Sequence, residues 1–172
     1  MNNKLLILCI SIFALSNNMQ ADKEVVASND DETAVKILIN TGKCPNCHFE
    51  SGTEFESWNL ERVDLSGAVL ERANLYDARL GGANFTDANL TDANLKMADL
   101  EGAIFVGAIL EGASFGRADL ADVNLTGANL NGAKLKKADN LESATIRDTQ
   151  CNGKTSLPRG FCCKDGFIEK KS

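Results

Sequence analysis

The stretch CPNCH at residues 44–48 holds the residue types best suited to chemistry in this sequence. Its spacing, Cys-x-x-Cys-His, is that of a c-type haem attachment site. Two cysteines at this spacing also occur in thioredoxin-like redox sites and in zinc sites. Each of these chemistries makes its own demands on the rest of the chain, and those demands distinguish between them.

The surrounding sequence favours a structural role for these residues. A redox site needs a βαβ setting and a helix start that lowers a thiol pKa, and neither is present near Cys44. Zinc needs four ligands, whereas Cys44, Cys47 and His48 supply three, and the next cysteine is Cys151. We therefore predict a disulfide or buried thiols here, with no cofactor and no metal; a c-type haem is the alternative interpretation.

The first residues have the pattern of an export signal. After the positively charged start MNNK comes the apolar run LLILCISIFAL at 5–15, which is too short to span a bilayer but suits a signal peptide. We predict a signal peptide at residues 1–21, with cleavage after Ala21, or after Ser16 as the alternative. The protein is then exported, to the periplasm or the medium, and has no stable membrane span.

Export makes disulfide bonds the default state of the remaining cysteines. Five stay in the mature chain, so at least one is free or paired between molecules: Cys44, Cys47, Cys151, Cys162 and Cys163. Cys151 with either Cys162 or Cys163 closes a loop of about ten residues, which stabilises a fold by roughly 2–3 kcal/mol. The sequence leaves that choice open.

Between these two cysteine-containing ends, a large apolar residue recurs at every fifth position, as in ANFTDANLTDANL at 83–95. Two residues before each large residue lies a smaller one, mostly Ala. Sixteen large residues follow one another without a break: Leu60, Leu65, Leu70, Leu75, Leu80, Phe85, Leu90, Leu95, Leu100, Phe105, Leu110, Phe115, Leu120, Leu125, Leu130 and Leu135.

A period of five fits neither a helix nor a flat strand. On a helix the leucines would spiral around the whole surface, and on a strand each odd step would place the next leucine on the other face. A backbone that turns a corner every five residues keeps them all inside. Four sides then close a coil of 20 residues, and successive coils stack about 4.8 Å apart as in a β-ladder.

The repeating unit A-[D/N]-[L/F]-x-x resembles the pentapeptide-repeat proteins over residues 47–147. The resemblance implies an all-β fold, a right-handed quadrilateral β-helix. Phe85 and Phe105, one coil apart, should then stack. Glycines two residues after the large residue should form the corners. Similar proteins carry a Cys-x-x-Cys before the first repeat without haem, and often end in a tail with Cys and Pro.

Both ends of such a stack need covering, because an open β-ladder invites aggregation. The stretch DDETAVKILINTGK at 30–43 predicts a short capping helix within an N-terminal segment at 22–46. At the other end the register slips by one before Leu141. The residues CNGKTSLPRGFCC then depart from the repeat, which predicts a disulfide-tied tail at 148–172.

The outer columns give no sign of catalysis. They are Asn, Asp, Glu, Thr, Ser, Arg and Lys, and His48 is the only histidine, so a catalytic relay has no base beyond that end. The net charge of −6 does not attract nucleic acid. We predict a non-enzymatic scaffold that acts as a rigid protein-interaction or structural module.

Three apolar residues interrupt the polar outer columns in IFVGAIL at 104–110. Ile104, Val106 and Ile109 should point outward, with Asn and Thr one coil away, and form a contact with a partner protein or a second copy. The resemblance adds an alternative, because some cytoplasmic pentapeptide proteins mimic DNA and bind DNA gyrase, a topoisomerase. Residues 58–139 carry 12 acidic and 8 basic residues, and this mixed charge imitates the continuous row of phosphates in DNA only weakly.

Overall fold

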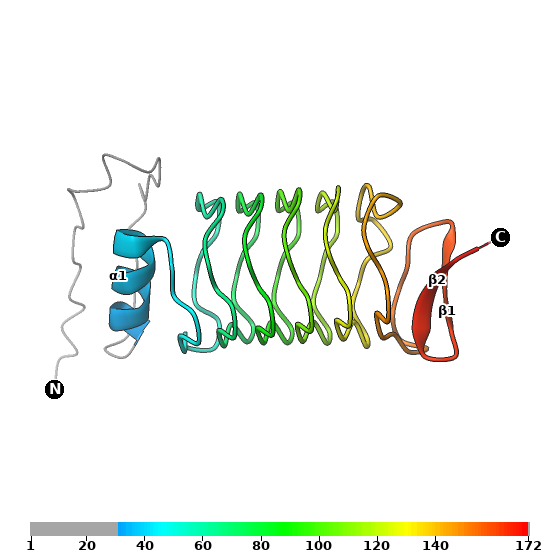
Figure 1. Cartoon of the computed structure of the whole chain (residues 1–172), viewed down its shortest axis with the longest axis horizontal. Helices are drawn as coiled ribbons and strands as arrows, with labels where there is room; N and C mark the ends of the chain where they lie inside the picture. The colour runs from blue at the N-terminus through cyan, green and yellow to red at the C-terminus, as the bar shows by residue number, and fades with distance from the viewer. Residues whose placement is uncertain (1–30, 172) are drawn as a thin grey trace, which may run out of the picture.

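A computed structural model of the chain describes residues 31–171 as a stack of coils with a helix at one end and a hairpin at the other (Figure 1). The helix α1 spans Asp31–Thr41, and strands β1 (Phe161–Lys164) and β2 (Phe167–Lys170) pair antiparallel. Within this part, no helix has the length and apolar character that a bilayer crossing requires. The predicted signal peptide lies outside the described residues.

The coils are joined by parallel bridges between single residues that lie 20 positions apart. Glu54 pairs with Asn74, Asn59 with Arg79, and the pattern repeats every five residues up to the pair Asp119 and Asp139. A coil of 20 residues therefore has four bridge positions. This confirms the stacked coil that the period of five predicts.

The interior of the stack is filled by the two predicted columns. Each of the sixteen large residues is at most 1% exposed, and the smaller residues two positions earlier are buried as well. The rings of Phe85 and Phe105 stack with their centroids 4.9 Å apart and their planes 7° from parallel. The inward register predicted from the sequence is confirmed.

The corners are tight turns that hold one residue in the left-handed region. From the turn that ends at Trp58 onward, the N–H of the small residue donates to the carbonyl of the large residue three positions earlier in the regular coils, as from Ala88 to Phe85 at 3.0 Å. Gly107, two residues after Phe105, has a φ of 67°. The sequence did not reveal that Asp87 and Arg72 adopt the same geometry, each with a φ of 56°. A non-glycine residue there costs roughly 1–2 kcal/mol, which the ladders on both sides offset.

The first and last coils depart from the 20-residue step. His48 pairs with Val69, 21 positions on, and Asn129 pairs with Gln150, also 21 positions on. The ladder then reaches Ser156, which pairs with Lys134. The coil thus runs nine residues past the predicted end at 147, because backbone pairing continues after the apolar period has stopped.

Each end of the stack is covered by a different element. In α1, Val35 and Leu38 are buried in the same core as the coils, and the helix ends where the Gly42 N–H donates to the Leu38 carbonyl. At the far end Ile168 of β2 is buried, and its N–H donates to the Thr149 carbonyl at 2.9 Å. A short helix within the predicted stretch 30–43 is confirmed, at Asp31–Thr41, and the tail contains a hairpin.

Shortening one inward leucine should destabilise the whole stack. Leu90 is fully buried, one coil from Leu70 and one from Leu110. We expect Leu90→Ala to lower the free energy of unfolding by about 2–5 kcal/mol in chemical denaturation, because it leaves a cavity. The control Glu111→Ala changes an exposed residue directly after an inward leucine, and should stay within about 0.5 kcal/mol. Equal losses in the two variants would contradict the inward register.

Candidate functional site

The Cys44–Cys47 disulfide lies inside the first corner of the coil, with its Cα atoms 5.3 Å apart. Lys43 bridges Asp64, so Cys44 occupies the large-residue position and Cys47 the next small-residue position. The Cys47 N–H donates to the Cys44 carbonyl at 3.2 Å, as each repeat corner does. The spacing Cys-x-x-Cys is therefore the spacing of two inward residues across one corner.

This geometry does not fit a c-type haem. Cys44 is 0% exposed, and its sulfur lies 3.4 Å from the Ala34 carbonyl oxygen of α1, so the helix covers it. His48 is exposed and bridges Val69 on the outer wall. Both cysteines would have to leave the core to reach a porphyrin, while the histidine lies on the opposite side of the backbone. Within residues 31–171, no three His, Cys, Asp or Glu side chains cluster in a way that could hold a metal ion.

A second disulfide, Cys151–Cys163, ties the last coil to β1, with its Cα atoms 5.8 Å apart. Cys151 follows the bridging residue Gln150 and so occupies the large-residue position in line with Leu130. Neighbouring residues of a strand face opposite ways, and Cys163 shares a face with the buried Phe161. Cys162 therefore points away from the coil and is the free cysteine of the described chain.

The two disulfides have a common design. Each joins a cysteine in a large-residue position of a terminal coil to a second cysteine, in the first corner at one end and in the hairpin at the other. One link closes a corner of the first coil, and the other fastens the hairpin to the last coil. The CPNCH motif thus has a structural explanation: it supplies two inward residues and one wall residue of the first coil.

The outer walls hold networks of polar side chains. The hydroxyls of three threonines donate to the amide oxygen of the asparagine two positions earlier, at 2.6–2.7 Å. Asn94 donates to Asn74 at 3.0 Å, and Arg79 forms an ion pair with Glu61. These contacts order the walls. His48 lies in the first coil, where it pairs with Val69.

The apolar patch formed by Ile104, Val106 and Ile109 interrupts these walls. Ile104 is 37% exposed and Ile109 is 40% exposed, while Val106 is half-buried. In the ladders Ile104 lies between Asn84 and Asn124, and Ile109 lies between Asn89 and Asn129. The patch is one coil thick and is bordered by side-chain amides on both sides.

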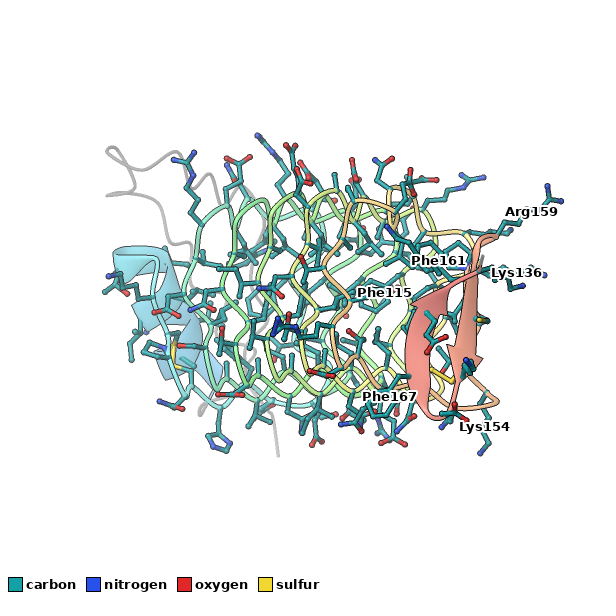
Figure 2. The ribbon with its side chains drawn as sticks, turned by 45° about the vertical axis from the view of Figure 1, so that its right-hand side comes forward. Phe115, Lys136, Lys154, Arg159, Phe161 and Phe167 are labelled. Atoms are coloured by element: carbon teal, nitrogen blue, oxygen red, sulfur yellow. A yellow bond between two sulfur atoms is a disulfide. The ribbon has the colours of Figure 1, made fainter. Side chains whose placement is uncertain are left out.

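A feature that the sequence analysis missed is the uneven charge along the stack. Residues 31–133 carry 7 basic and 16 acidic residues, whereas residues 134–171 carry 9 basic and 5 acidic ones. Figure 2 shows Lys136, Lys154 and Arg159 at the end that carries the hairpin. The overall charge of −6 conceals this difference, which a charge count taken section by section along the chain would have found.

The repeat has a clear match among protein families. The family described as pentapeptide repeats (8 copies) matches residues 51–87, 68–107 and 103–139, which together make up more than half of the chain. No curated protein matches the sequence significantly.

Several solved structures are similar to this chain. A pentapeptide-repeat protein, Rfr23, from the cyanobacterium Cyanothece 51142 has 29% identity and a TM-score of 0.70, with 73% of this chain and 98% of that chain covered. One from the Arabidopsis thaliana thylakoid lumen has 32% identity and a TM-score of 0.41, covering 63% and 61%. QnrB1, a plasmid-mediated fluoroquinolone resistance protein, has 17% identity and a TM-score of 0.33, covering 64% and 58%. Only the first is similar enough to support an argument, and it supports the fold.

The pairing of Cys151 with Cys163 can be tested against its neighbour Cys162. We expect Cys163→Ser to lower the free energy of unfolding by about 3 kcal/mol in non-reducing denaturation, because the disulfide that joins two positions 12 residues apart is lost. The control Cys162→Ser removes a free thiol one position away and should leave stability nearly unchanged. A larger loss in Cys162→Ser than in Cys163→Ser would show that Cys162 is the partner.

Proposed function

Because the chain belongs to the pentapeptide-repeat family, we propose that it is an exported, non-enzymatic scaffold whose rigid wall binds another protein. In this proposal the stack is a right-handed quadrilateral β-helix. Its interior is filled by Leu, Phe and Ala side chains, so the groups that meet a partner have to lie on the outside. The family likeness supports binding over catalysis.

Rigidity is the property that the ladders provide. Within one middle coil, the Leu90 N–H donates to the Ile109 carbonyl at 2.7 Å, and the Asn89 N–H donates to the Ala68 carbonyl at 2.8 Å. Each coil is thus held from both sides by its own backbone. A surface built on such a frame loses little conformational entropy on binding, which favours affinity for a partner of matching shape.

The apolar patch is the observation that carries the proposed binding site. An apolar centre with a polar rim is the usual anatomy of an interface, and the asparagines beside Ile104 and Ile109 supply that rim. Three side chains alone fall short of the roughly 800 Å² per partner that a stable complex buries. The partner therefore also contacts the surrounding wall, which suits a different protein with an extended surface.

Export is supported by the cysteines as well as by the N-terminal sequence. Two disulfides, each with one half buried in the core, suit an oxidising compartment, where such bonds form and persist. In a reducing compartment both terminal coils would lose their covalent links. The proposal accordingly places the protein in the periplasm or outside the cell.

A DNA-mimicking gyrase binder is the weaker alternative. Such a protein needs carboxylates in an unbroken line, where DNA has its phosphates. Here the walls mix charges, and Glu61 is engaged by Arg79. The likeness to QnrB1 is too distant to carry an argument, and an exported protein would not meet a cytoplasmic enzyme.

Replacing the patch tests the proposed binding site. We expect the triple variant Ile104→Thr, Val106→Thr and Ile109→Thr to lose the partners that the wild-type protein captures from the periplasm and the medium. Threonine keeps the β-branched shape, so the fold should be retained. The control Val69→Thr removes apolar area from the same ladder, outside the patch, and should keep those partners.

Two outcomes would count against the site. If the triple variant captures the same partners as the wild type, the patch is not the binding surface. If it loses only self-association, measured by light scattering, the patch joins two copies of this chain and the proposal of a different partner is wrong.

A further inference from the structure

The charge of this protein changes sign along its long axis. Residues 31–133, which form α1 and most of the coils, have a formal charge of −9, and residues 134–171 have one of +4. The second group forms the end of the stack and the hairpin (Figure 1). A long molecule with this asymmetry orients near a negatively charged surface, because its basic end is attracted and its acidic part is repelled.

Residues 134–171 hold nine exposed cations beside five exposed carboxylates, and five of the cations form what we call the basic cap: Lys136, Lys137, Lys154, Arg159 and Lys171. Among the described residues, none of the five makes an ion pair. Two neighbouring cations are already engaged, since Lys164 pairs with Glu169 at 3.7 Å and Lys170 donates to the Glu142 carbonyl at 2.8 Å. The basic cap thus has charge available for a partner.

An exposed aromatic ring accompanies the basic cap. Phe167 of β2 is 45% exposed, although Phe161 and Ile168 of the same hairpin are buried. Its backbone bridges Gln150 at the edge of the last coil. Nothing in the core requires a phenylalanine here, because it is Ile168 that packs inward. Figure 2 shows Phe167 on the other side of the hairpin from Lys136 and Arg159, at the same end of the protein. Cationic side chains and an exposed apolar ring at one end of a protein are the composition that proteins use at the surface of anionic membranes.

We infer that the basic cap docks this end of the protein on an anionic lipid surface, with Phe167 entering the headgroup region and the coils pointing away. Each Lys or Arg near such a surface strengthens binding by about fivefold. Salt in the solution screens the repulsion between the acidic coils and the lipid surface. Coils are about 4.8 Å apart, so walls two coils away lie beyond a Debye length of about 8 Å.

Other occupants fit the basic cap less well. A second copy joined head to tail would meet residues 31–57, which carry five acidic and two basic residues, but such a heterologous contact does not close and would chain copies without end. A soluble polyanion would match the charge but would gain nothing from Phe167. Ile109 of the apolar patch is separated from Phe167 by Asn129 and Gln150 in the same ladder, and the inference does not rest on the proposed partner site.

Vesicle binding tests the inference. We expect the wild-type protein to sediment with phosphatidylcholine vesicles that contain phosphatidylglycerol, to stay in solution with pure phosphatidylcholine, and to be released by high salt. The triple variant Lys136→Gln, Lys154→Gln and Arg159→Gln should bind on the order of 100-fold more weakly. The matched control Arg62→Gln, Lys96→Gln and Arg117→Gln removes equal charge from the coils and should bind as the wild type or more tightly.

Phe167→Ser separates a lipid surface from other anions. It should weaken binding to the vesicles several-fold and leave binding to polyphosphate unchanged. The inference is overturned if the wild-type protein ignores phosphatidylglycerol, if the two triple variants lose affinity equally, or if Phe167→Ser leaves vesicle binding intact. It is equally overturned if the loss in the cap variant is a loss of self-association, which would make the basic cap a contact between copies.

Discussion

The hydrogen-bonded ladder between successive coils is the constraint on which the rest of the structure depends. In a middle coil, one bond runs back to the preceding coil, from the Asn89 N–H to the Ala68 carbonyl, and the next runs forward, from the Leu90 N–H to the Ile109 carbonyl. This pairing holds each coil at one height and fixes which residue faces inward. The period of five, the Ala and Leu columns and the left-handed corners follow from it, because any other choice would break a ladder or expose a leucine.

A ladder of this kind has two open ends, and the sequence changes where they occur. The first and last coils depart from the 20-residue step, and each carries a disulfide-bonded cysteine, Cys44 or Cys151, in a large-residue position. At the far end the disulfide joins the hairpin to a core column, whereas at the first coil it closes a corner beside α1. Closed ends prevent strand addition by other molecules. Because the hairpin closes the ladder at the far end, the outer surface of that end is available to carry the basic cap.

The coil was predictable from the sequence because the inward positions tolerate few residue types, and their order is therefore visible as a period. Where the backbone rather than the side chain is constrained, the sequence gives little sign. Ser156 continues the ladder without an apolar residue to mark it. Arg72 and Asp87 occupy left-handed corners that glycine would have signalled. Whether Cys151 pairs with Cys162 or Cys163 depends on which face of β1 packs against the coil, and this is set by tertiary structure. The patch residues were found because they break a polar pattern, whereas the basic cap is assembled from separate segments.

Hydrogen exchange followed by mass spectrometry, with the disulfides intact and after their reduction, tests the central claim most directly. The account predicts that amides of the middle coils, residues 79–119, stay strongly protected in both states, since their ladders are held from both sides. Protection should fall only in the first coil and in the last coil with its hairpin. Reduction that removes protection evenly along the chain, or that leaves the two ends unchanged, would contradict a ladder whose ends are closed by Cys44–Cys47 and Cys151–Cys163.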